Sequence, residues 1–134
     1  MLLDLEEFFT VGHDTFFESI FPTSSYGVTF EDDLTTGYFY AVETQPELQI
    51  LNALHIYNVA EVIDKDKSSK IQIAWTDDGQ IVSLLINNYC HAIFDFKEKA
   101  GYCRSGFPES NGKWTQTRIL TDEIITALFA IKNK

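Results

Sequence analysis

The first 64 residues contain no Lys and no Arg, although they hold twelve Asp and Glu. All ten basic residues lie between Lys65 and Lys134, so the chain is acidic at one end and nearly balanced at the other. A surface of one charge sign repels nucleic acids and anionic membranes and attracts cationic ligands. The sequence therefore predicts no nucleic-acid partner and no membrane partner, and it favours a basic protein as partner.

Cysteine is also scarce, since the chain has only Cys90 and Cys103. Two cysteines are too few for a disulfide scaffold, and their spacing fits no pair of zinc ligands. No apolar run has the length of a membrane span, and the acidic start differs from the positively charged start of a secretory signal. We therefore expect a cytoplasmic protein with two reduced thiols. Because phosphate-binding glycine loops and the Gly-x-Ser-x-Gly elbow are missing, no cofactor, metal or catalytic residue is predicted.

The chain does contain enough apolar material for a compact fold. Of its 134 residues, 45% are hydrophobic and 14% aromatic, and a chain of this length buries roughly two thirds of its unfolded surface. No linker, repeat or low-complexity segment divides it, so residues 1–134 are interpreted as a single domain. The net charge of −10 favours solubility and leaves the oligomeric state open.

Four segments of the first half are rich in Phe, Tyr, Val and Ile, the residue types that favour strands. They are residues 15–21, 26–31, 37–43 and 50–59. The last segment also fits helical spacing, but Ile56, Tyr57 and Val59 favour a strand. Residues 2–9 are interpreted as a short helical turn.

Three further strand-like runs, residues 70–76, 80–87 and 89–96, are separated by Asp78-Gly79 and Asn87-Asn88. Both residue pairs tolerate the backbone of tight hairpins, so the runs predict an antiparallel meander. Two-residue turns predict the pairs Trp75–Val82, Ile73–Leu84, Ile71–Ile86, Leu84–His91 and Val82–Ile93. A fourth strand after residues 97–101 would place Cys103 opposite Asp95. Both faces of this sheet are largely apolar, so both should be covered.

The C-terminal segment predicts a helix that covers one face. Thr121 is a plausible N-cap, and Asp122 and Glu123 suit the positive end of a helix dipole. Apolar residues recur at helical spacing at Ile124, Ile125, Leu128, Phe129 and Ile131. The predicted fold class is α+β, mainly an antiparallel β-meander of about six to eight strands, sandwich or barrel-like, with this amphipathic helix packed on the sheet.

Two sets of residues are candidates for a functional site. The acidic group Glu31, Asp32 and Asp33, followed by Tyr38, lies in the half without cations. It lacks the oxygen spacing of a calcium loop and nothing fixes a catalytic carboxylate pair, so a solvated turn is the simplest interpretation. Complementary charge nevertheless makes it a candidate for docking a basic partner. The hypothesis that we favour is a non-enzymatic binding module, of the immunity or regulatory type.

The alternative hypothesis is an enzyme or small-ligand binder with a pocket in the sheet. His55, His91, Asp95 and Arg104 are the polar residues that interrupt apolar strands, and such groups converge in ligand pockets. Strand geometry argues against His91 and Asp95 acting together, because four residues of strand separate them by about 13 Å. A structural histidine is the simpler interpretation of His91.

Several of these motifs together resemble a known family. The motifs are Tyr26 to Asp33, Thr36 to Ala41, Leu54 to Tyr57, Trp75 to Gly79, Ile86 to Phe96, Gly101 to Arg104, and Phe107-Pro108. Over roughly residues 24–118 the chain is similar to the bacterial domain of unknown function 2251. The resemblance implies a bacterial, single-domain, cytoplasmic protein, and it transfers no catalytic residue because the family is uncharacterised.

Overall fold

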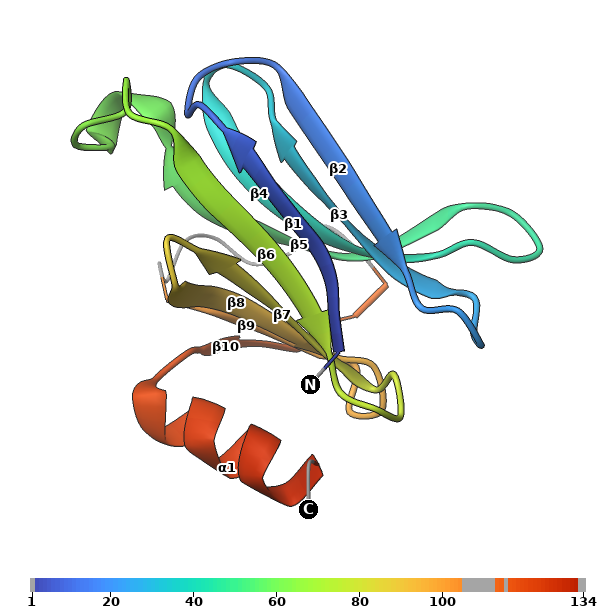
Figure 1. Cartoon of the computed structure of the whole chain (residues 1–134). Helices are drawn as coiled ribbons and strands as arrows, with labels where there is room; N and C mark the ends of the chain where they lie inside the picture. The colour runs from blue at the N-terminus through green and yellow to red at the C-terminus, as the bar shows by residue number, and fades with distance from the viewer. Residues whose placement is uncertain (1, 105–112, 115, 133–134) are drawn as a thin grey trace.

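Two β-sheets packed face to face, with one helix outside the larger sheet, make up this protein (Figure 1). The computed structural model describes residues 2–104, 113–114 and 116–132. The described part has ten strands, more than the six to eight expected, and the sheets stay open rather than closing into a barrel. The predicted α+β sandwich with a C-terminal helix is confirmed.

The smaller sheet contains the four strands predicted in the first half. Their order is β2 (Thr15–Ile20), β3 (Tyr26–Asp32), β4 (Thr36–Glu43) and β5 (Gln49–Asn58), each antiparallel to its neighbour. Side chains alternate along these strands. Val28, Phe30 and Phe39 therefore point into the sandwich and are fully buried, while Phe16 on the other face is 60% exposed.

The larger sheet has the order β1-β6-β7-β8-β9-β10. These strands are β1 (Leu2–Phe9), β6 (Ser69–Trp75), β7 (Ile81–Ile86), β8 (Tyr89–Asp95), β9 (Ala100–Cys103) and β10 (Gln116–Ile119). Neighbours are antiparallel except β9 and β10, which are parallel. A short 3-10 helix, η1 (Val59–Glu61), follows β5.

The helical turn predicted for residues 2–9 is wrong, because these residues form β1. Pairing with β6 places Leu5 opposite Ile73 and Phe9 opposite Ser69. Local sequence gives only a weak preference over so short a segment, and hydrogen bonding to an available sheet edge decides the conformation.

The meander has the predicted register between β6 and β7 but not between β7 and β8. Ile73 lies opposite Leu84 as expected, whereas Leu84 lies opposite Ala92 and Val82 opposite Phe94. The predicted pairs Leu84–His91 and Val82–Ile93 are wrong because a β-bulge leaves His91 as an extra residue.

The bulge exchanges the two faces of β8. Ala92 and Phe94 point into the sandwich, and Ile93 points toward the helix. The next strand is displaced too, so that Cys103 pairs with Ala92 instead of the predicted Asp95.

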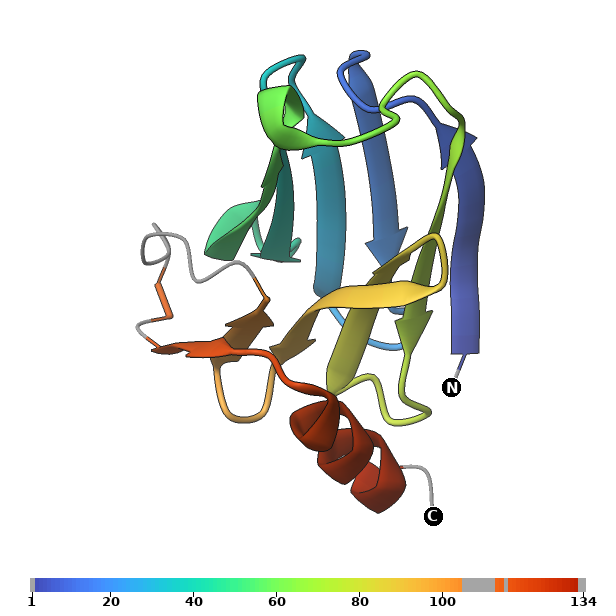
Figure 2. The same cartoon turned by 90° about the vertical axis from the view of Figure 1, so that its left-hand side faces the viewer.

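The helix α1 (Asp122–Lys132) covers the outer face of the larger sheet (Figure 2). The backbone N–H of Ile124 donates to Thr121 Oγ1 at 3.2 Å, which confirms the predicted cap. Ile124, Ile125, Leu128 and Phe129 pack on a layer that includes Ile81, Ile93 and Tyr102. The side chain of Ile131, also predicted for this face, lies outside the described residues.

Candidate functional site

The outer face of the four-stranded sheet carries a row of four side chains, one from each strand. Phe16 pairs with Glu31, Glu31 with Tyr38, and Tyr38 with His55. Directly opposed residues in a sheet share a face, so these side chains form one line across it. We call this line the outer row. No helix or strand of the described chain lies over it (Figures 1 and 2).

The rings of the outer row are stacked. The Tyr38 and His55 ring centroids are 4.9 Å apart at an interplanar angle of 21°, and Tyr40 stacks on Tyr38 at 5.8 Å. The hydroxyl of Tyr40 donates to Glu31 Oε1 at 3.5 Å. Partial burial, with the nearby charge of Glu31, raises the pKa of Tyr40 to about 12. The row therefore presents stacked aromatic rings beside the carboxylate of Glu31.

The structure separates the four residues predicted for docking. Glu31 and Tyr38 belong to the outer row, and Asp33 is exposed in the turn after β3. Backbone N–H groups of Thr36 and Thr35 donate to Asp33 Oδ1, which lowers the pKa of that carboxyl group. Asp33 is therefore ionised and available to a partner at physiological pH.

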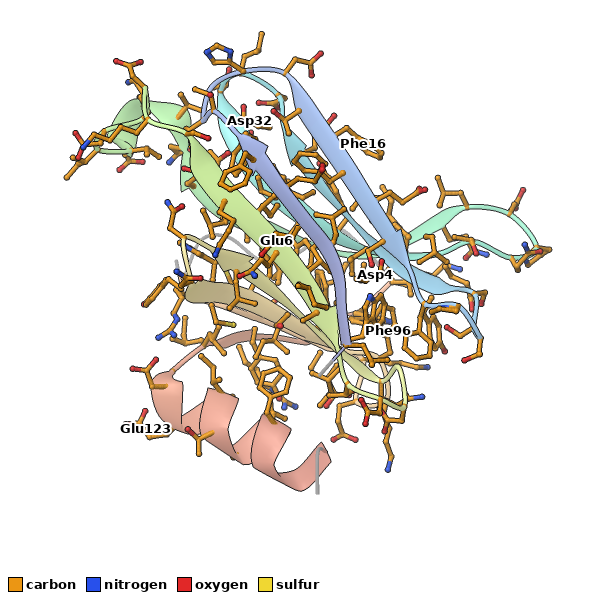
Figure 3. All side chains as sticks on the ribbon, in the orientation of Figure 1. Asp4, Glu6, Phe16, Asp32, Phe96 and Glu123 are labelled. Carbon is orange, nitrogen blue, oxygen red and sulfur yellow. The ribbon has the colours of Figure 1, made fainter. Side chains whose placement is uncertain are left out.

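Asp32 has a different place, because it is fully buried at the end of β3 (Figure 3). Its carboxylate accepts hydrogen bonds from the Gly12 N–H at 2.7 Å, the Leu34 N–H at 2.9 Å and the Tyr57 hydroxyl at 2.6 Å. Three donors satisfy the buried charge. Asp32 thus connects two turns and β5, and it offers no atom to a partner.

The residues of the alternative pocket do not gather in one cavity. His55 stacks in the outer row, and Asp95 is buried at the end of β8, where its Oδ1 accepts the backbone N–H groups of Lys97 and Glu98. Of the four, only His91 and Arg104 are neighbours. The backbone N–H of Arg104 donates to the backbone carbonyl of His91 at 3.3 Å. The Arg104 side chain is already engaged by Cys90 O and Asp122 Oδ1.

His91 lines a separate cleft of about 500 Å³, which we call the loop cleft. Its walls come from the connection between β5 and β6 and from residues next to the turn between β7 and β8. The lining residues are Val11, Tyr57, Val62, Ile63, Asp64, Lys65, Lys67, Ser68, Ser69, Ile86, Asn87 and His91. The loop residues Asp64, Lys65, Lys67 and Ser68 form one wall of this cleft, and no sequence motif marks them as part of a site.

Neither His91 nor its neighbour Cys90 has the protonation state of a catalytic pair. Burial, with a smaller contribution from the charge of Arg104, lowers the pKa of His91 to about 4, so the ring is neutral at pH 7. Burial raises the pKa of the Cys90 thiol to about 11. A thiolate nucleophile beside an imidazolium is therefore not formed. Among the described residues, no three His, Cys, Asp or Glu side chains are grouped so as to hold a metal ion.

Comparison with known proteins identifies the family. Residues 9–129 match the family of domain of unknown function 2251, described as an uncharacterized protein conserved in bacteria. The chain belongs to this family. The match extends beyond residues 24–118, where the sequence motifs resemble the family, and it includes most of α1.

A relative from Haemophilus influenzae (strain ATCC 51907 / DSM 11121 / KW20 / Rd), named an uncharacterized protein, is 38% identical over 110 residues. The aligned region covers 80% of this chain and 65% of the relative, so the chain spans about two thirds of the relative's length. No solved structure is significantly similar to this member of the family. Within the described part, no helix is long and apolar enough to cross a membrane.

Proposed function

We propose that this protein is a non-enzymatic binding module of the bacterial cytoplasm that docks a basic protein partner through the outer row. The observation that carries the proposal is the position of Glu31 between Phe16 and Tyr38, on a sheet face that no described helix or strand covers. An immunity-type or regulatory role, in which the module neutralises or controls a basic protein, fits such a surface. Nucleic acid and membrane are not proposed as partners, because the strands of this face carry no cation.

Charge supports a basic partner. The four strands of the smaller sheet lie entirely within the first 64 residues, which contain no Lys or Arg. Glu18 and Glu31 project from the outer face, and these strands contain no Lys or Arg that could pair with them. A field of one sign accelerates the encounter with an oppositely charged protein and disfavours acidic competitors.

The aromatic residues supply the contact energy that charge alone does not. Exposed ion pairs contribute little, whereas a few aromatic residues dominate most protein interfaces. Phe16 and Tyr38 provide apolar surface on either side of Glu31. An Arg side chain of the partner fits this arrangement, because guanidinium stacks on aromatic rings and pairs with carboxylate.

The proposal is tested by comparing two aromatic truncations in a pull-down from bacterial lysate. Tyr38→Ala removes a half-buried ring from the outer row, and Phe8→Ala removes a more exposed ring from β1, where Phe8 is 69% exposed. A basic protein should be retained by the wild type and by Phe8→Ala, lost from Tyr38→Ala, and released by high salt. Retention of the same protein by all three baits would contradict the proposal.

The alternative, an enzyme or ligand binder with His55, His91, Asp95 and Arg104 in one pocket, has less support. His55 and Asp95 have their own partners away from the loop cleft. Of the four residues only His91 lines that cleft.

A further inference from the structure

The loop cleft has the size and the mixed lining of a small-molecule site. Its volume of about 500 Å³ lies within the roughly 300–1,000 Å³ of ligand pockets. Val11 and Ile86 are buried, and Val62 and Tyr57 are partly buried. These four provide an apolar floor, while Lys65, Lys67, Ser68, Asn87 and His91 provide polar groups around it.

Several of the polar groups are already used by the protein. The Tyr57 hydroxyl donates to Asp32, and Asn87 Oδ1 accepts the Lys70 N–H while its Nδ2 donates to Ser69. These groups fix the shape of the wall. They are not the first groups that a ligand would contact.

Two nitrogen groups of the lining remain available. Among the described residues, the ammonium of Lys65 has no ion pair and the imidazole of His91 has no hydrogen-bond partner. The ring of His91 makes only an edge contact with Tyr89, at 5.0 Å between centroids. The nitrogens of His91 are not among the buried polar atoms without a partner, so water reaches them and a ligand can take its place. Both groups lining the loop cleft can donate a hydrogen bond.

The charges of the lining favour an anion. The lining contains one acidic residue, Asp64. Its Oδ2 lies 4.0 Å from Nζ of Lys67, and both side chains of this ion pair are exposed. Lys65 then leaves one uncompensated positive charge in a protein of net charge −10. This net positive charge attracts an anion to the lining and repels a cation.

We propose that the loop cleft binds a small organic oxyanion, with its charged end at Lys65 and His91 and its apolar end over Val62 and Ile86. The site shares no residue with the outer row, which lies on the outer face of the smaller sheet. The Lys65 ammonium supplies charge, the His91 N–H supplies a directed hydrogen bond, and the floor excludes water from the apolar end.

The test follows the imidazole resonances of the full chain by NMR during titration with hexanoate. His91 should shift saturably, while His55, in the outer row, should not move and serves as an internal reference. Hexanol and hexylammonium have six carbons, as hexanoate has, and an apolar chain that is longer by one carbon, but they lack the oxyanion, and neither should produce the His91 shift. A saturable shift with hexylammonium or hexanol equal to that with hexanoate, or no saturable shift with hexanoate, would overturn the proposal.

Two variants distinguish a local contact at Lys65 from an effect of the protein's net charge. Lys65→Ala removes the proposed contact at an exposed position, so the fold should be retained. Lys97→Ala removes the same charge from an exposed turn that does not line the cleft. The dissociation constant for hexanoate should rise about tenfold in Lys65→Ala, the size expected for a lost charged contact, and stay unchanged in Lys97→Ala. An equal rise of the dissociation constant in both variants would show that only the net charge matters, and it would also overturn the proposal.

Discussion

The hydroxyl of Tyr57, near the end of β5, donates to Oδ2 of Asp32, at the end of β3, across 2.6 Å. The same carboxylate accepts backbone N–H groups of Gly12 and Leu34. Burial, the hydrogen bond and the charge of Asp32 together raise the pKa of Tyr57, so its proton stays on the phenol. This network joins the turns after β1 and β3 to β5, next to the loop cleft that Tyr57 lines.

Removal of the Tyr57 hydroxyl should therefore destabilise the fold. In Tyr57→Phe the ring remains, but the buried Asp32 carboxylate loses one of three donors, a change that costs about 1–3 kcal/mol. Chemical denaturation should show a lower midpoint with the same denaturant dependence. Tyr38→Phe, which removes a hydroxyl from the outer row, is the control and should change the unfolding free energy by less than about 0.5 kcal/mol. Equal stability of the two variants would mean that the Asp32 network contributes little.

A second buried network joins the two sheets. The Trp75 indole N–H donates to Ser19 Oγ at 2.9 Å, and the Ser19 hydroxyl donates to Asp4 Oδ2 at 2.5 Å. Ser19→Ala should lower the unfolding free energy by about 1–3 kcal/mol, because the fully buried indole is left without an acceptor. Tryptophan emission should report the change around Trp75 in the folded state. Ser68→Ala, at an exposed position, is the control, and a destabilisation of the same size there would contradict this explanation.

The pKa of His91 gives the direction of a pH effect. The ordinary pKa of 6.5 applies to the unfolded chain, and burial lowers the pKa to about 4 in the folded protein. Between these values the unfolded state binds more protons, so the unfolding free energy should fall as pH decreases from 6.5 to 4. At about 1.4 kcal/mol per pKa unit, the full effect is at most about 3 kcal/mol.

This pH effect is measured as a difference between wild type and His91→Gln, since carboxyl groups also titrate at low pH. The variant should have the flatter dependence of unfolding free energy on pH over the interval from 6.5 to 4. Ser68→Ala, which changes the lining of the same cleft without removing a titratable group, is the control and should keep the slope of the wild type. Parallel curves for His91→Gln and wild type would show that His91 is protonated equally in both states.

The sequence predicted those parts of the fold that depend on local patterns. Alternation of apolar residues located β2 to β8, and Asn87-Asn88 marked a turn in which both residues have positive φ angles of 52° and 67°. Thr121 located the start of α1. Each of these signals acts between residues that are close in the chain, so a single sequence contains them.

The errors all arise from contacts between distant residues. β1 is a strand because β6 offers it an edge, and His91 is displaced by a bulge that no local signal marks. Asp32 is buried because Gly12 and Tyr57 reach it from other elements. The adjacent Glu31 and Asp33 have the same charge and similar neighbours in sequence, so composition alone gave all three acids one role.

The outer row could have been anticipated in part. Alternation places Phe16 and Tyr38 on the face opposite Phe30 and Phe39, but only the pairing of β2 to β5 shows that these side chains align. The loop cleft could not be anticipated, because its lining combines residues of β5 to β8 with the loop between β5 and β6, and only the folded chain brings these segments together.

The charge at Glu31 should affect the rate at which the partner associates more than the lifetime of the complex. Long-range attraction acts on the encounter, whereas contacts within the interface set dissociation. With the partner captured by the wild type, Glu31→Gln should slow association several-fold at low salt and should reduce the dependence of that rate on salt. Tyr38→Ala should instead accelerate dissociation.

Glu123→Gln removes one negative charge from α1, on the opposite side of the molecule from Phe16 (Figure 3), and is the matched control for the association rate. If Glu123→Gln slowed association as much as Glu31→Gln, the net charge of the protein, rather than the outer row, would direct the partner.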